Sequence, residues 1–389
     1  MYTGRLIFSQ VMDFLPKHAF DTCVQRYHGN YRVRHLTCWD QYLCMAFAQL
    51  TYRESLRDIE ACLRALGPKL YHAGLRGSVS KSTLAEANEN RDYRIYADLA
   101  GVLIVHARAL YKKEDFGLSL DHTVYAFDST TIDLCLSLFP WAQFRKRKGA
   151  IKLHTLMDLR GSLPCFISIT VGKTNDKLAL DDLPLEPGAF YIMDRGYIDF
   201  ARLYVITKRA AFFVIRSKNN LHYARGAYRH VDKDTGLRSD QTIRLQGLKS
   251  AKRYPAPVRR ITFFDEQTRT RFVFLTNNFI LPALTIAKLY KCRWQVELFF
   301  KWIKQHLRIK TFYGTSQNAV KTQIWIAISV YVLVSIIKKR LGLELSLHEI
   351  LQILSITLFE KVPMAQVVTK SYDKNLEINA SNQLKLFDF

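Results

Sequence analysis

The sequence lacks the motifs that identify the commonest cofactor sites. Its seven cysteines are an odd number, and no two of them have C-x-x-C spacing. Neither a disulfide framework nor a structural zinc site is therefore indicated, and we expect reduced cysteines in a cytoplasmic protein. Neither G-x-x-x-x-G-K-S/T nor G-x-G-x-x-G occurs, so nothing indicates a site for a nucleoside triphosphate or a dinucleotide.

Long hydrophobic runs are also missing. The N-terminus, MYTGRLIFSQVMDFLPKH, has no continuous apolar stretch of the kind that signal peptides carry. The most apolar run, IWIAISVYVLVSII at 324–337, has 14 residues, whereas a membrane-spanning helix needs about 20. We therefore predict that this run is a buried core helix and that the protein does not span a membrane.

Acidic residues are scarce. Lys and Arg total 57 against 34 for Asp and Glu, so the formal net charge is +23. Such an excess indicates a polyanionic partner, either nucleic acid or an anionic membrane surface. Composition alone favours nucleic acid, and it leaves open a basic soluble protein with no such ligand.

The pattern along the 389 residues predicts several segments. We predict a helical N-terminal domain (1–115), the first part of an α/β core (116–218), a β-rich insertion (219–280), further core helices (281–360) and a C-terminal tail (361–389). The helical domain could bind DNA ends, or it could serve only for packing.

The segment from about 120 onward changes from helical periodicity to strand patterns. Runs rich in β-branched and aromatic residues indicate strands at 123–136, 150–159 and 163–171, and later at 189–194 and 211–218. Short helical patterns near 177–183 and at 198–209 separate the last three strands. This order predicts a mixed sheet with helices on its faces.

Two acids stand where strands meet turns. Asp128 lies at or near the end of the first strand, in AFDST, and Asp194 ends a later strand, in MDRGY. Acids in such places are held by a rigid scaffold and stay within reach of a substrate. Either acid alone could equally be a turn or capping residue.

A third acid, Glu297, stands in the strongly basic segment 290–310, which contains no Gly or Pro and is predicted to be one helix. At about 100° per residue, a single face carries six polar side chains. They are Tyr290, Arg293, Glu297, Lys301, Lys304 and Arg308. This face could be a solvated surface with ion pairs at i,i+4 spacing, worth a few tenths of a kcal/mol. It could instead hold phosphates with its bases and a Mg²⁺ or Mn²⁺ ion with its acid.

These residues carry a resemblance to a known family. Tyr290-x2-Arg293-x3-Glu297-x6-Lys304 resembles the Tyr-Arg-Glu-Lys signature of the insertion-sequence-four family of bacterial transposases. DSTTIDLCLSLFPW around Asp128 and MDRGYIDF around Asp194 are also similar to that family. The resemblance covers roughly 120–345. One departure is Asn175, which replaces the His that often precedes the Asp of the GKTND loop.

The resemblance implies an RNase H-like fold with a triad of Asp128, Asp194 and Glu297. The triad would hold two Mg²⁺ or Mn²⁺ ions, and Tyr290, Arg293 and Lys304 would contact the phosphates of the transposon end. The implied activity is metal-dependent cleavage at the ends of an insertion sequence, followed by strand transfer into target DNA.

The implied partner is double-stranded DNA, bound by a homodimer. Two alternatives stay open. A nuclease could use the same triad without joining strands, and a domesticated protein could bind DNA without cutting it.

The C-terminal sequence ASNQLKLFDF is predicted to be flexible. Its segment Gln383-Leu384-Lys385-Leu386-Phe387 resembles the Gln-Leu-x-Leu-Phe peptide by which bacterial proteins dock on the replication sliding clamp. A short extended peptide can bind in this way through a few apolar anchors. Equally, the tail could fold back onto its own domain or onto a partner subunit.

Overall fold

A computed structural model describes residues 4–114, 116–118, 120–306 and 312–368. The chain forms two compact units. One contains residues 112–301, and the other combines residues 1–111 with residues 302–389. The three acids singled out in the sequence all lie in the unit formed by residues 112–301.

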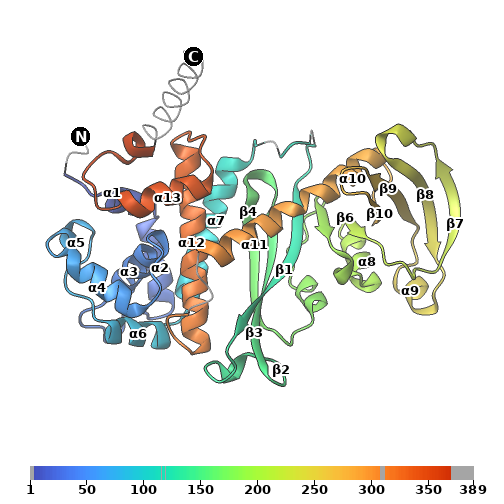
Figure 1. The fold of residues 1–389 in the computed structure, drawn as a ribbon. Helices are drawn as coiled ribbons and strands as arrows, with labels where there is room; N and C mark the ends of the chain where they lie inside the picture. The colour runs from blue at the N-terminus through green and yellow to red at the C-terminus, as the bar shows by residue number, and fades with distance from the viewer. Residues whose placement is uncertain (1–3, 115, 119, 307–311, 369–389) are drawn as a thin grey trace, which may run out of the picture. The chain divides into compact units, whose positions relative to one another are not determined.

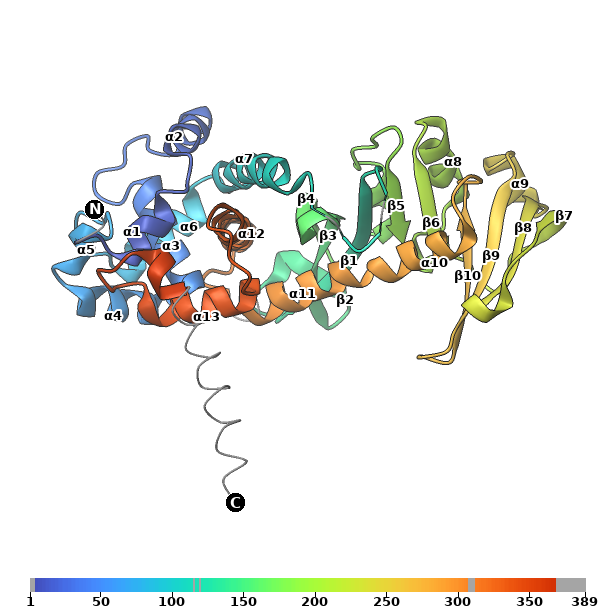
Figure 2. The same ribbon diagram turned by 90° about the horizontal axis from the view of Figure 1, so that it is seen from above.

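The first part of the sheet in this unit has the strand order β4-β3-β1-β5-β6 (Figure 1, and Figure 2 for β5). The pairs β1–β3 and β3–β4 are antiparallel, whereas β1–β5 and β5–β6 are parallel. Three antiparallel strands followed by two parallel ones form the RNase H-like arrangement, so the predicted fold class is confirmed. The strands are β1 Val124–Leu134, β3 Lys148–Asp158, β4 Leu163–Val171, β5 Phe190–Met193 and β6 Phe212–Arg216.

One face of these strands forms a hydrophobic core. Tyr125 and Phe127 of β1 pack there with residues of β5 and β6 and with Leu203 of helix α8 (Phe200–Lys208). Because successive side chains of a strand point to opposite faces, Asp128 lies on the other face from Phe127. The helix expected near 177–183 is a 3-10 helix over Asp176–Leu180.

The β-rich insertion continues the same sheet. Strand β10 pairs with β6, and the order runs on through β9, β8 and β7. A buried ion pair between Arg259 and Asp240, with a 2.7 Å Nη2–Oδ2 distance, ties β9 to β8. The elements are β7 Tyr223–Arg229, β8 Leu237–Leu245, α9 Leu248–Arg253, β9 Val258–Asp265 and β10 Thr270–Thr276, and the short strand β2 Gln143–Arg145 pairs with β3 at the other end of the sheet.

The predicted single helix over 290–310 is wrong. Helix α10 (Ala283–Cys292) ends before Arg293, and helix α11 covers Trp294–His306. At the junction the Arg293 N–H bonds to the Tyr290 carbonyl and the Val296 N–H to the Arg293 carbonyl. These i,i+3 bonds tighten one turn and interrupt the regular α-helical pattern.

The other unit is helical. Helix α12 packs against α3, α6, α7 and α13 (Figure 2). Its length and mean hydropathy of 1.8 would suffice to cross a membrane, but 89% of its most apolar window is buried inside the protein, as predicted for a core helix. The helices are α1 Ile7–Met12, α2 Lys17–Arg26, α3 Cys38–Leu50, α4 Leu56–Leu66, α5 Lys69–His72, α6 Lys81–Asn90, α7 Arg94–Tyr111, α12 Gln317–Arg340 and α13 Leu347–Thr357.

The compact units divide the chain differently from the sequence-based segments. The prediction assigned residues 281–360 to the α/β core, whereas α12 and α13 belong to the helical unit. The physical reason is the largely apolar surface of α12, which is covered by helices from the N-terminal segment. The functional roles predicted for these segments stay predictions.

Candidate active site

The parallel pairing of β1 with β5 brings Asp128 and Asp194 to the same level of the sheet. Phe127 is opposite Met193 in the register, and each acid is the next residue of its chain. Because neighbouring strands lie about 4.8 Å apart, this pairing places the two acids close together. Asp128 is not at the end of its strand, because β1 continues to Leu134. It lies where the pairing with β5 stops, which leaves that side of the strand open.

Arg293 connects Asp128 with Glu297. Its Nη1 lies 2.5 Å from Oδ2 of Asp128, and its Nη2 lies 2.6 Å from Oε1 of Glu297. The side chains of Arg293, Asp128 and Glu297 are 16%, 19% and 36% exposed. The one guanidinium group therefore serves as counter-ion to two half-buried carboxylates on elements distant in sequence.

Tyr290 connects the end of α10 with Asp194 through a hydrogen bond. Its hydroxyl donates a hydrogen bond to Oδ1 of Asp194 over 3.2 Å. The ring is buried against Phe272 and Phe274, with centroids 6.2 and 4.8 Å away. Burial raises the pKa of Tyr290 to about 12, so the phenol stays protonated and remains a donor.

The surroundings of Asp128 disfavour its charge. Burial raises the pKa of Asp128 to about 6, although Arg293 and the Ser129 N–H act in the opposite direction. The charges of Asp194 and Glu297 raise the pKa further. A cation bound beside Asp128 would offset this unfavourable environment for its charge.

Carboxylate oxygens are the ligands that Mg²⁺ and Mn²⁺ prefer. Within the part of the chain that the structure describes, no three His, Cys, Asp or Glu side chains converge closely enough to hold a metal ion. Instead, the Arg293 guanidinium lies between two of the acids as a stand-in cation. The donor set therefore fits a divalent ion, provided that Arg293 moves away.

The remaining predicted residues are placed as follows. Lys301 and Lys304 are exposed residues of α11. Arg308 lies outside the described residues, and so do Gln383, Leu384, Leu386 and Phe387. Of the residues expected to contact DNA phosphates, Tyr290 and Arg293 are engaged with the acids.

Sequence reasoning missed Arg216. Ile215 is opposite Met193 in the register of β5 and β6. Arg216, the next residue, therefore lies level with Asp128 and Asp194 on a third parallel strand. Its guanidinium lies 5.0 Å from the ring centroid of Phe272. A charged residue at the end of an apolar strand is the same signal that identified Asp194, and it could have identified Arg216.

A polar cluster behind Asp128 was also missed. Ser129 donates its N–H to Asp128 and its hydroxyl to Asp176, over 2.8 and 3.2 Å. Lys152 Nζ lies 3.0 Å from the same Asp176 oxygen. Asp176 of the GKTND loop is thus connected to Asp128 through one serine.

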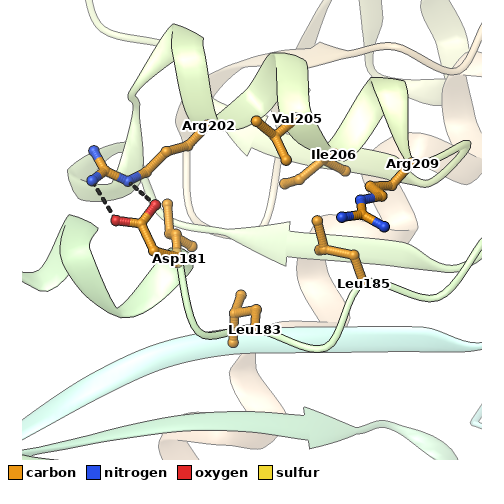
Figure 3. A pocket seen from close by; sticks show the side chains of 8 residues that line it. Asp181, Leu183, Leu185, Arg202, Val205, Ile206 and Arg209 are labelled. Carbon is orange, nitrogen blue, oxygen red and sulfur yellow. Dashed lines mark hydrogen bonds and ion pairs between the residues drawn. The ribbon is translucent and has the colours of Figure 1, made fainter.

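A pocket of about 320 Å³ lies apart from these acids, beside α8 (Figure 3). Leu183, Leu185 and Ile206 line it, and Arg202 closes one side through a two-bond pair with Asp181. It contains none of the predicted site residues.

Comparisons with known proteins agree with this geometry. Residues 119–333 match the family described as "Transposase DDE domain", and residues 3–76 match a domain of unknown function (DUF4372). "Putative transposase y4zB" of Sinorhizobium fredii is 32% identical over 294 residues, which cover 75% of this chain and 80% of that protein. "Probable transposase for insertion sequence element IS5377" of Geobacillus stearothermophilus is 29% identical over 65% of this chain and 66% of that protein.

One solved structure, of the piggyBac transposase synaptic complex with hairpin DNA, aligns with 95% of this chain and 83% of that chain. Its TM-score of 0.46 and its 10% identity are too low to establish a shared fold. The family match covers more than half of the chain and contains all three acids. The chain therefore belongs to the DDE transposase family, and it is a DNA transposase.

Proposed function

We propose that the protein is the transposase of a bacterial insertion sequence of the insertion-sequence-four family, and that Asp128, Asp194 and Glu297 are its catalytic triad. The observation that carries the proposal is the cation bridge between Asp128 and Glu297 beside the strand end that bears Asp194. The spacing Tyr290-x2-Arg293-x3-Glu297-x6-Lys304 supports the finer family assignment.

The three acids would together hold two Mg²⁺ or Mn²⁺ ions. When bound, two such ions activate the attacking oxygen and stabilise the leaving oxygen of a phosphodiester. Tyr290 keeps Asp194 in place, and Ser129 orients Asp128. Arg293 leaves the acids and contacts DNA phosphates, for which its planar fork of donors is suited.

The reaction consists of two phosphodiester displacements. Water first attacks the phosphorus at the element end, which breaks the bond to the 3′ oxygen and frees a 3′-hydroxyl. That hydroxyl then attacks a target phosphorus, so one phosphodiester forms as another breaks. The first step is a favourable hydrolysis and the second exchanges one phosphodiester for another, so neither step requires a nucleoside triphosphate.

A cleavage assay tests the proposal. Duplexes carrying the element end should be nicked in Mg²⁺ or Mn²⁺ and left intact in EDTA. A protein that binds these ends and never nicks them in either metal would be a domesticated DNA-binding protein instead.

Lys304→Ala is expected to weaken binding to element ends and to lower the slope of log affinity against log salt concentration by about 1. Lys304 is exposed on α11, so it is available for a phosphate. Lys291→Ala is the matched control, because Lys291 already pairs with Asp265 over 3.0 Å. Fluorescence anisotropy at several salt concentrations measures both slopes. Equal slopes for Lys304→Ala and the unsubstituted protein would make this helix face a solvated surface only.

The proposal places the protein in the bacterial cytoplasm, as a homodimer on DNA.

The C-terminal tail would dock on the replication sliding clamp, which would direct transposition toward replicating DNA. A peptide ending in Gln383-Leu384-Lys385-Leu386-Phe387-Asp388-Phe389 is expected to bind the clamp, and its Leu386→Ala/Phe387→Ala version is not. Calorimetric titration of both peptides is the measurement, and the docking hypothesis is discarded if the two bind equally or neither binds.

A further inference from the structure

Three arginines gather on one face of the β-rich extension of the sheet. In the register, Arg271 is opposite Phe264, Gln241 is opposite Arg260, and Arg225 is opposite Ile243. Residues that face each other across neighbouring strands point to the same side, as do alternate residues of one strand. Arg225, Arg260 and Arg271 therefore share a side, and we name them the arginine face.

The arginine face has no acid to neutralise it among the described residues. None of its three members takes part in an ion pair there. Arg260 donates one long hydrogen bond of 3.3 Å to the hydroxyl of Thr262, and its guanidinium lies 5.2 Å from the ring centroid of Tyr223. Burial lowers the pKa of Arg260, and the nearby Arg271 and Arg225 lower it further.

Arg259, one residue earlier, shows what a structural arginine in this sheet looks like. It points to the opposite face and is buried against Asp240, with both oxygens of the acid accepting hydrogen bonds. It also donates to the backbone carbonyls of Asn278 and Leu281. Folding therefore pairs Arg259 with an acid and leaves Arg260 beside two further positive charges, which is unfavourable unless an anion binds.

We propose that the arginine face binds the phosphodiester backbone of duplex DNA, away from the bond that is cut. Guanidinium forks match phosphate oxygens in geometry as well as in charge. Two tyrosines flank the cluster, Tyr223 beside Arg260 and Tyr228, which is 62% exposed, and a tyrosine hydroxyl can add a bond to phosphate. The inference rests on the proposed function in that DNA is the substrate.

The arginine face is distinct from the catalytic face of the same sheet. Tyr290 packs on Phe274, which is opposite Ile261 on the side of Arg259. Asp128 lies on that same side, since its neighbour Phe127 packs with Phe213 and Leu275 in the core of the other side. DNA held on the arginine face would thus add affinity without touching the acids.

The test is equilibrium binding of the full chain to a duplex by fluorescence anisotropy, in metal-free buffer at several salt concentrations. For Arg225→Ala/Arg260→Ala/Arg271→Ala, the slope of log affinity against log salt should fall by about 3, one for each lost phosphate contact. Arg260→Ala alone should lower it by about 1. Arg202→Ala is the matched control, because Arg202 is already paired with Asp181 over 2.6 Å, and its slope should not change.

Three results would overturn the inference. They are an unchanged slope in the triple variant, an equal drop in Arg202→Ala and Arg260→Ala, and a drop seen with single-stranded DNA but not with duplex. A thermal melt of each variant separates lost contacts from lost folding, and Arg260→Lys, which keeps the charge, should retain most of the slope. If the unsubstituted protein fails to cut DNA while the triple variant still loses affinity, the arginine face stands and the proposed reaction falls.

Discussion

Asp128→Ala, Asp194→Ala and Glu297→Ala are each expected to lower metal-dependent strand cleavage by about a thousandfold or more, while binding to the element end persists. Metal ions contribute several kcal/mol of transition-state stabilisation in such reactions, and each 1.36 kcal/mol is about tenfold in rate. Each substitution removes a carboxylate that would hold metal and leaves the exposed lysines of α11 in place. Gel assays of nicking in Mg²⁺ measure the rates, and anisotropy measures the affinity.

A matched control for this prediction is Asp181→Ala. Asp181 is a half-exposed acid that pairs with Arg202 in the pocket beside α8, so its loss should leave cleavage unchanged. Nicking at the full rate by any one of the three triad variants would remove that residue from the proposed site.

Arg293→Ala is expected to destabilise the DNA-free protein by about 1–3 kcal/mol and to make divalent ions stabilise it more. Removing one partner from a half-buried ion pair leaves its acid without a counter-charge. Here Asp128 and Glu297 would both lose theirs, since Arg293 contacts them at 2.5 and 2.6 Å. A bound Mn²⁺ ion no longer has to displace the guanidinium, so its affinity should rise about tenfold, which is 1.4 kcal/mol.

Thermal melts with and without Mn²⁺, together with calorimetric titration of Mn²⁺, test this prediction without any cleavage. Arg293→Lys is the control, because lysine keeps a positive charge near the acids but lacks the two guanidinium nitrogens that contact Asp128 and Glu297 together. Identical melting temperatures and Mn²⁺ affinities for Arg293→Ala and the unsubstituted protein would show that the guanidinium does not compete with metal.

Local patterns in the sequence were enough to place most strands of the catalytic unit. The strand predicted at 163–171 is β4 as observed, because β-branched and aromatic residues bounded by a turn mark a strand wherever it pairs. The buried helix at 324–337 was also predictable from its own residues, because an apolar run of this length is stable only where neighbouring elements cover it.

The details that depend on distant parts of the chain were not predictable. The Arg293–Glu297 pair follows from i,i+4 spacing, but the second contact joins Arg293 to Asp128 across 165 positions. Only the parallel pairing of β1, β5 and β6 aligns Asp128, Asp194 and Arg216. Nor could it be predicted that Arg259 pairs with an acid whereas Arg260 does not, because that difference depends on Asp240 in another strand.

The most direct measurement of the central claim is strand joining by the unsubstituted protein. Precut element ends with a free 3′-hydroxyl are incubated with a supercoiled target in Mg²⁺, beside ends that carry a 3′-deoxy terminus. The proposed reaction predicts covalent joining of the hydroxyl ends, loss of joining with Glu297→Gln, and none with the deoxy ends. Nicked target without any joined product would identify a nuclease and contradict the assignment of strand transfer.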